Sequence, residues 1–226
     1  PTTGELIMHR FNTVVRRVMV GATALAIVAS VSAMSAAPSH VHASAMVPAD
    51  AWLKRLNGKH RQLFDSPSSS GGISLIHILN FYDTYNKAYR VPDTDINAIG
   101  TFYGMTTFMG VNDAMWAKYR IGEFLGEKDA NGVPATKNPW REAPTILGME
   151  LRQASIEALQ KRGATFILCN NSLGILSGML AKARGLDADA VLADMKANIL
   201  PDVELIPGMV VAIDQAHAAG VSYHRQ

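Results

Sequence analysis

A short apolar segment, residues 164–169 (ATFILC), most constrains the fold of this chain. Gly163, a residue type that commonly ends a helix, precedes the segment, and the polar run 170–172 follows it. Apolar runs of about four to eight residues between such breaks are typical of buried parallel strands. The segment ends on Cys169, the one cysteine among the 226 residues. Because open α/β sheets bind ligands at the carboxyl ends of their strands, the sequence places its sole thiol at such an edge.

Strand-like and helix-like segments alternate along the rest of the chain. Runs rich in apolar and β-branched residues predict strands at 60–65, 95–103, 164–169, 203–206 and 221–223. Helical spacing and stop signals predict helices at 49–56, 73–89, 113–124, 145–162, 173–184, 188–198 and 207–219. Alternating strands and helices require right-handed crossovers and a mainly parallel sheet. The fold expected is therefore a small doubly wound α/β sandwich of about five strands with helices on both faces.

Two helix starts carry explicit cap residues. Asn112 or Asp113 is expected to cap the helix before Met115, and Asn171 or Ser172 the helix that begins at Leu173. Between these elements, residues 126–144 are rich in Gly, Pro and Asn and predict a loop excursion from the core. A loop of that length inside a compact domain is usually functional or an interface element.

The loop and the preceding helix also offer aromatic and polar side chains. Asp113, Trp116 and Tyr119 share the helix, and residues 138–140 (NPW) lie in the loop. These side chains are candidates to line a pocket or a subunit contact.

The first 45 residues have the layout of a signal peptide. A basic region containing Arg16 and Arg17 precedes an uncharged stretch, residues 18–33, and small-x-small sites follow at 31–33 and 43–45. The apolar stretch is shorter than the roughly 20 residues of a membrane span, so a cleaved signal is expected rather than a stable membrane anchor. The arginine pair resembles a twin-arginine export signal, with Sec export as the alternative. Residues 46–226 are then a single periplasmic domain.

Composition narrows the function classes. The chain is 48% hydrophobic and 18% charged, so it can bury a core. The formal net charge is only +2 and no Lys/Arg cluster stands out after the signal, which argues against nucleic acid as a partner. One cysteine cannot form an internal disulfide, so packing alone must stabilise the domain.

The C-terminal third carries a recognisable pattern. It consists of Cys169 to Leu173 (CNNSL) after a strand, Ile206 to Val210 (IPGMV) opening the last helix, Gln215-Ala216 within that helix, and Gly220 to Tyr223 (GVSY) closing it. The strand ending in Phe102-Tyr103-Gly104 fits as well. Together these segments resemble the DsrE/DsrF-like family, in its exported, signal-bearing branch.

That resemblance implies a small α/β protein that forms a homotrimer or homohexamer. The best understood members pass persulfide sulfur from one cysteine to another, and Cys169 matches the sulfur-carrying position. The resemblance therefore implies a sulfur donor or acceptor protein as partner. No cofactor or metal is expected, because the histidines have no metal-ligand spacing and the sequence has no Walker loop or Gly-rich dinucleotide fingerprint.

Cys169 is accordingly the candidate catalytic residue, as a sulfur acceptor. A thiolate needs hydrogen-bond donors or a positive field, and the start of the following helix can supply both. Asn170, Asn171 and Ser172, with Tyr103 and Gly104 from the neighbouring strand, are the residues expected to form the pocket and stabilise the thiolate.

Other interpretations remain open at the level of sequence. Cysteine is often a small buried hydrophobe, and complete burial with no donor near the sulfur would favour an inert thiol. The protein could equally be a non-catalytic oligomeric protein of the same fold that binds a ligand or partner. A weaker hypothesis is metal or haem handling through Met105, Met109 and scattered histidines.

Overall fold

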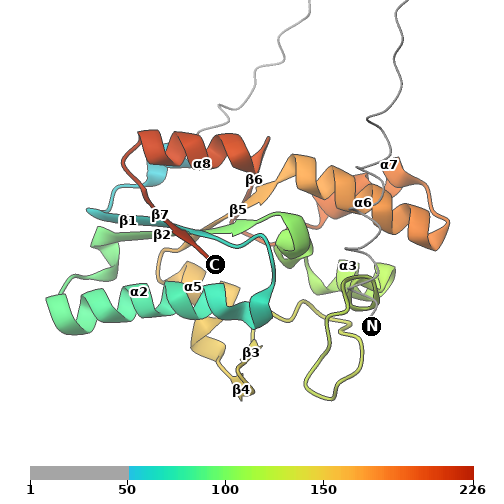
Figure 1. Cartoon of the computed structure of the whole chain (residues 1–226), viewed down its shortest axis with the longest axis horizontal. Coiled ribbons are helices and arrows are strands. Elements are labelled where there is room, and N and C mark those ends of the chain that lie inside the picture. The colour runs from blue at the N-terminus through green and yellow to red at the C-terminus, as the bar shows by residue number, and fades with distance from the viewer. Residues whose placement is uncertain (1–50) are drawn as a thin grey trace, which may run out of the picture. The chain divides into compact units, whose positions relative to one another are not determined.

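The computed structural model describes residues 51–226 (Figure 1). The predicted signal peptide, residues 1–45, lies outside the described residues. Five strands form one sheet, in the order β6-β5-β2-β1-β7, and every neighbouring pair is parallel. The strands are β1 (His60–Asp65), β2 (Ile96–Phe102), β5 (Thr165–Cys169), β6 (Val203–Ile206) and β7 (Ser222–Arg225). The predicted parallel α/β sheet is confirmed.

Helices cover both faces of this sheet (Figure 1). On one face lie α2 (Ile73–Tyr89) and α5 (Ile156–Lys161), and on the other lies α8 (Met209–Ala218) together with the short 3-10 helix η1 (Leu53–Arg55). The central strand β2 is buried along its whole length, as a strand covered on both faces must be. Phe102 and Phe166 stack in the larger core cluster, at a centroid distance of 5.2 Å. Ile99 and Ile167 belong to the smaller cluster under α8.

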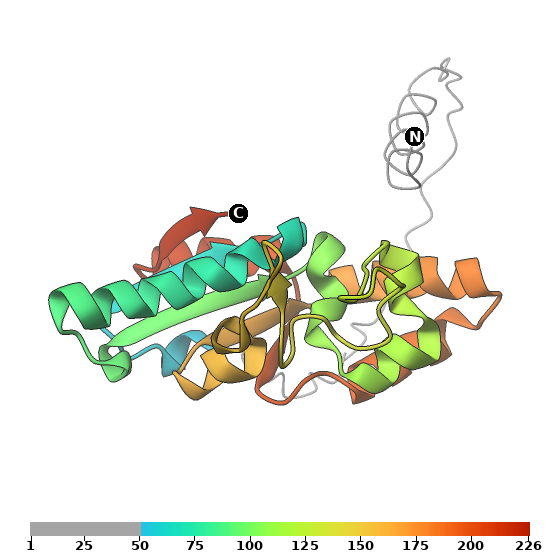
Figure 2. The same cartoon turned by 90° about the horizontal axis from the view of Figure 1, so that it is seen from below.

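A second group of helices gathers beyond the carboxyl ends of the strands, at one end of the sheet (Figure 2). It contains η4 (Gly104–Gly110), α3 (Asp113–Tyr119), α4 (Ile121–Leu125), α6 (Asn170–Arg184) and α7 (Ala188–Ala197). The helix α6 continues away from β5 instead of folding back over the sheet, and α7 packs along it. Of these, η4 and α6 begin directly at the carboxyl edge of the sheet, after β2 and β5.

The helix predicted for residues 145–162 is wrong in its first half. Residues 145–150 form a small hairpin of β3 (Thr145–Ile146) and β4 (Met149–Glu150), and only η5 (Arg152–Ala154) and α5 follow as helices. Leu147 and Gly148 both have positive φ, of 52° and 77°, which is the backbone of a tight two-residue hairpin turn. Leu147 is consequently exposed, and its helical spacing from Leu151 reflects no shared face.

Smaller differences concern element boundaries. Asn112 is confirmed as a cap, because its side chain accepts the N–H of Met115. The helix it starts is broken at Arg120, whose φ of 53° separates α3 from α4. The helix predicted at 49–56 is reduced, among the described residues, to the single turn η1, and α8 begins at Met209 rather than at residue 207.

Candidate functional site

The sole cysteine sits where β5 ends and α6 begins. Cys169 is the last residue of β5 and is itself the N-cap of α6, because its Sγ accepts the backbone N–H of Ser172 at 3.4 Å. The predicted cap at Asn171 or Ser172 is therefore wrong: the helix begins three residues earlier, at Asn170. Sulfur can replace the usual oxygen cap because the N–H groups of a first helical turn need any available acceptor.

A second backbone donor reaches the same sulfur from a distant part of the chain. The N–H of Met209, the first residue of α8, lies 3.3 Å from Sγ of Cys169. The amino ends of α6 and α8 therefore converge on one sulfur atom. Each helix start carries partial positive charge and unpaired N–H groups, so this arrangement suits a sulfur that carries negative charge.

The surroundings of the sulfur are otherwise apolar and sheltered. Cys169 is 5% exposed and belongs to the core cluster that also contains Ile167 and Met209. Burial alone would describe an inert hydrophobe. An inert cysteine is expected to have no hydrogen-bond donor near its sulfur. Cys169 has two such donors, which distinguishes it from an inert thiol.

Ser172 does not cap the helix but joins it to the neighbouring strand. Its Oγ accepts the N–H of Gly104 at 2.9 Å and donates to Oγ1 of Thr107, 2.6 Å away. Thr107 in turn donates to the carbonyl of Gly104 at 2.7 Å. These contacts hold the start of η4 against the first turn of α6, directly beside the cysteine.

Gly104 is required for this junction. Its φ is +57°, and a Cβ at this position would lie 2.7 Å from the carbonyl oxygen of Pro67. Any side chain would therefore be strained and would displace the loop after β1. The predicted role of Gly104 beside the site is thus one of backbone shape.

The two asparagines after the cysteine contribute less than expected. The backbone N–H of Asn171 donates to the carbonyl of Pro207 at 3.3 Å, which holds α6 next to the start of α8. Within residues 51–226, neither the side chain of Asn170 nor that of Asn171 makes a hydrogen bond to the sulfur. The expected donor from the first turn of the helix is a backbone group, the N–H of Ser172.

Tyr103 lies beside the cysteine, directly after the end of the neighbouring strand β2. Phe102 pairs with Leu168, so the following residues Tyr103 and Cys169 occupy neighbouring positions at the sheet edge. Burial, and after it the Asp65 carboxylate, raises the pKa of Tyr103 above its ordinary value. The structure therefore places Tyr103 beside Cys169. It also shows an acid near the site, Asp65, that the sequence analysis did not identify.

That acid, Asp65, ends β1 and is only 3% exposed. Its Oδ2 accepts the hydroxyl of Tyr223 at 2.5 Å, and this bond raises the pKa of Tyr223. Its Oδ1 is buried and has no hydrogen-bond partner within residues 51–226. An aspartate that closes a predicted strand at the ligand-binding edge was the signal in the sequence that could have identified it.

The loop and the aromatic residues named above separate in the structure. Trp116 and Tyr119 are buried in the main core and line no surface. Asp113, with Asn138 and Trp140, borders an open pocket of about 560 Å³ under the loop. Arg141 holds this loop in place by ion pairs of 2.8 Å to Asp113 and to Glu157.

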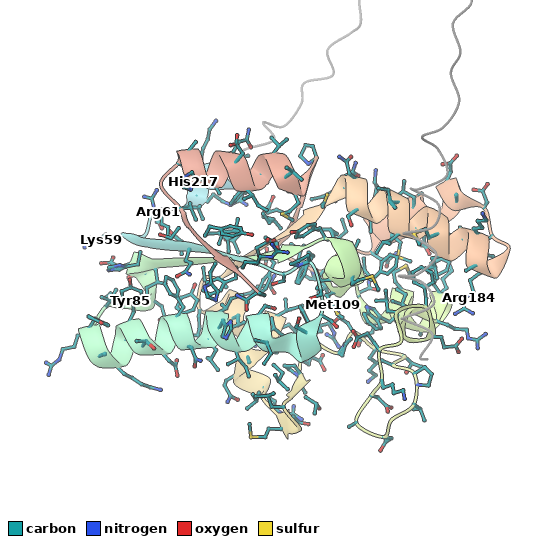
Figure 3. All side chains as sticks on the ribbon, viewed as in Figure 1. Lys59, Arg61, Tyr85, Met109, Arg184 and His217 are labelled. Carbon is teal, nitrogen blue, oxygen red and sulfur yellow. The ribbon has the colours of Figure 1, made fainter. Side chains whose placement is uncertain are left out.

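The residues suggested for metal handling do not assemble. Met109 is fully buried inside the molecule (Figure 3). Met105 is 48% exposed, so the two methionines lie in different environments. His217 lies on α8, and His60 packs against Tyr85 of α2 at a centroid distance of 4.1 Å. Within the described part of the chain, no three His, Cys, Asp or Glu side chains gather as a metal site.

The fold and the site define a parallel α/β protein with one sheltered thiol between two helix starts. No model of a known protein family matches the chain, and no curated protein matches it significantly. Among solved structures, the chain is similar to a protein of unknown function from Methanobacterium thermoautotrophicum. The two are 16% identical, over 74% of this chain and 99% of that chain, with a TM-score of 0.36. In residues 51–226, no helix has the length and apolar character needed to cross a membrane.

Proposed function

We propose that the protein is a single-cysteine sulfur carrier, in which Cys169 accepts and passes on a persulfide sulfur. The observation that carries this proposal is the pair of backbone N–H groups, from Ser172 and Met209, that both donate to Sγ. A structural helix cap accounts for the Ser172 donor alone, whereas two donors on one sulfur also stabilise a thiolate or the terminal sulfur of a persulfide.

The transfer itself is an exchange at sulfur. The thiolate of Cys169 attacks the terminal sulfur of a donor persulfide, R–S–SH, and forms a new S–S bond while the donor S–S bond breaks. The products are the Cys169 persulfide and the donor thiolate, R–S⁻, so no oxidant or reductant is consumed. The reverse reaction with an acceptor thiolate delivers the sulfur and restores Cys169.

Shelter and compartment complete the proposal. Cys169 is only 5% exposed, so its sulfur is protected from progressive oxidation and is reached only by a small donor or a fitted partner. We place the protein in the periplasm, after removal of residues 1–45 through the twin-arginine or the Sec route, and expect a homotrimer or homohexamer. A protein that donates or accepts sulfur is the partner this function requires.

Mass spectrometry of the intact protein after polysulfide treatment tests the proposal. We expect the mass to increase by one or more sulfur atoms, and we expect dithiothreitol to reverse the increase. The Cys169→Ser variant is the control and should gain no mass. Iodoacetamide should label Cys169 faster in the folded protein than in a urea-denatured sample. If labelling is no faster than in urea and no sulfur is gained, the protein is not a sulfur carrier.

The alternative is a non-catalytic oligomeric binding protein of the same fold. Exposed apolar side chains on the two helices that start at the site favour it, namely Val210 and Val211 of α8 and Ile175 of α6. Under this alternative Cys169 stays unmodified while the protein assembles or binds a partner. Gel filtration with light scattering, run beside the mass measurement, separates the two functions.

A further inference from the structure

Among residues 51–226, the buried carboxylate of Asp65 has no hydrogen-bond partner of ordinary geometry for one of its two oxygens. Oδ2 accepts the hydroxyl of Tyr223 at 2.5 Å, whereas Oδ1 is buried without such a partner, and the carboxylate lies near enough to the Tyr103 hydroxyl to raise its pKa. Asp65 as a whole is 3% exposed. Leaving a carboxylate oxygen unpaired in the interior is costly, and native proteins rarely do so without a functional reason.

Asp65 belongs to the same face and the same edge of the sheet as the cysteine. Side chains alternate along a strand, so Asp65 shares a face with Leu63 and Cys169 shares one with Ile167. Leu63 and Ile167 both belong to the cluster beneath α8. Tyr103 follows β2, the strand between β1 and β5, and packs against the same cluster.

The separation of the two groups follows from the register. Phe64 pairs with Gly100 and Thr101 with Ile167, so Asp65 is two strands across from Cys169 and two residues back. Ordinary strand spacing and rise give about 12 Å between their Cα atoms. Because both side chains project from one face, a ligand that lies along that face over Tyr103 can contact both of them.

Tyr223 covers the carboxylate from the edge of the sheet. It is 46% exposed and lies on β7, an edge strand whose four residues are all exposed. A charged group that faces Asp65 is Arg225, its exposed cross-strand partner. The site therefore already has one exposed cation beside it, and an ammonium group must be held there by the carboxylate and the phenolic oxygens against that charge.

We propose that Asp65, Tyr103 and Tyr223 form a subsite for the ammonium group of a small aminothiol or its persulfide, whose sulfur lies at Cys169. The placement of the ligand sulfur at Cys169 rests on the proposed function, whereas the binding of the ammonium group at Asp65 does not. An ammonium group has three N–H donors, which match the unpaired Oδ1 and the two phenolic oxygens. The tyrosine rings add favourable contact with a cation.

Binding is tested without the cysteine, in the Cys169→Ser protein. Cysteamine is titrated while the ring signals of Tyr103 and Tyr223 are followed by NMR, and 2-mercaptoethanol, with a hydroxyl in place of the ammonium, serves as the matched probe. We expect saturable shifts with cysteamine alone. Asp65→Asn, which keeps an acceptor for Tyr223, should abolish them, and Asp214→Asn, at an exposed position of α8, should not. No saturable shift, or equal shifts with both probes, overturns the inference.

Exchange at Cys169 provides the second test. The thiolate attacks cystamine, forms a mixed disulfide and releases one cysteamine thiolate, and bis(2-hydroxyethyl) disulfide reacts in the same way without the charge. The rate of Cys169 with each disulfide is divided by the rate of N-acetylcysteine with the same disulfide, which removes the difference in intrinsic reactivity between the two disulfides. We expect a preference for cystamine of at least about tenfold, the size of a charge-assisted hydrogen bond. The preference should fall toward one in Asp65→Asn and be reduced in Tyr223→Phe.

The outcomes separate the two proposals. Equal normalised rates with both disulfides overturn the subsite and leave the sulfur carrier intact. No reaction with either disulfide counts against the sulfur carrier, and the NMR titration then decides the ammonium subsite alone. If Asp65→Asn loses its native circular dichroism, Tyr223→Phe takes its place in both measurements, and an unchanged preference in that variant contradicts the subsite.

Discussion

The backbone N–H of Met209 donates to Sγ of Cys169 across 3.3 Å, although the two residues are 40 positions apart in the sequence. Through this contact the amino end of α8 meets the amino end of α6 at a single sulfur atom. Both donors belong to the main chain, so their positions are fixed by the helices and not by flexible side chains. Such preorganised donors are effective in stabilising charge because they need no rearrangement when it forms.

Removal of this one donor is possible without breaking the helix. Met209 is the first residue of α8 and follows Gly208 in an extended conformation, with φ −157° and ψ 130°, which is compatible with a following proline. We expect Met209→Pro to slow iodoacetamide labelling of Cys169 by about tenfold, since a donor to a charged sulfur is lost. The labelling rate in the folded protein is the measurement.

The matched control is Met209→Ala. It removes the same buried side chain, which is 1% exposed, but keeps the N–H. Both variants should lose stability by about 2 to 4 kcal/mol through the cavity left in the core. Equal labelling rates in the two variants would mean that the Met209 N–H does not activate the sulfur.

Gly104 offers a test of the backbone beside the site. Gly104→Ala should destabilise the fold by about 3 kcal/mol, because the residue has positive φ and its Cβ would approach the Pro67 carbonyl to 2.7 Å. Gly126→Ala is the control, since its φ is +76° but nothing lies within 4 Å of its Cβ. Urea unfolding of both variants isolates the clash, and equal losses of stability would argue against it.

The hydroxyl pair of Ser172 and Thr107 should behave as one unit. Ser172→Ala leaves the Gly104 N–H without its acceptor and should cost about 1 to 2 kcal/mol. Thr107→Val removes the other side of the same contact, 2.6 Å away, so the double variant should lose less than the sum of the single losses. Because the Ser172 N–H is retained, sulfur loading of Cys169 should persist. Strict additivity in urea unfolding would show that the hydroxyls act separately.

Much of the sheet could be predicted because its signals are local. The predicted bounds of β1, α2 and β6 are confirmed to the residue, since apolar periodicity and flanking Gly, Pro and Ser residues mark each of them. The hairpin at 145–150 could not be predicted in the same way. Its apolar residues fit helical spacing, and only the left-handed backbone at Leu147 and Gly148 decides against a helix.

The site, like the sheet, has some features that follow from local sequence and others that depend on the fold. The position of Cys169 at a strand end could be predicted from the segment that contains it. The Met209 donor and the Asp65 carboxylate could not, because both reach the edge through the order of strands in the sheet. A side-chain cap at Asn171 or Ser172 was the natural local choice, and the sulfur replaced it because Cys169 already occupied the cap position.

At the opposite end of the sheet, Arg162 joins two acids on different elements. Its guanidinium lies 2.7 Å from Asp83 of α2 and 2.9 Å from Asp93 of η3 (Asp93–Asp95). The hydrogen bond from Arg162 lowers the pKa of Asp93, and hydrogen bonds from Lys87 and then from Arg162 lower the pKa of Asp83. Both carboxylates therefore titrate at lower pH in the folded protein than in the unfolded chain.

This linkage fixes the sign of a pH dependence. A carboxylate whose pKa is lowered by folding stabilises the protein at pH values above its pKa in the unfolded chain, which is about 4. That stability is lost as the pH falls through the pKa of the folded state. Arg162→Gln should therefore be less stable than the parent by about 1 kcal/mol at neutral pH, a modest figure because the pairs are partly exposed. The loss of stability caused by Arg162→Gln should shrink below about pH 4.

The control is Lys161→Gln, which removes a neighbouring exposed charge. In urea unfolding, its difference in stability from the parent should not depend on pH in this way. A deficit for Arg162→Gln that is independent of pH would assign its effect to packing against Tyr82, 4.7 Å away, and not to the ion pairs.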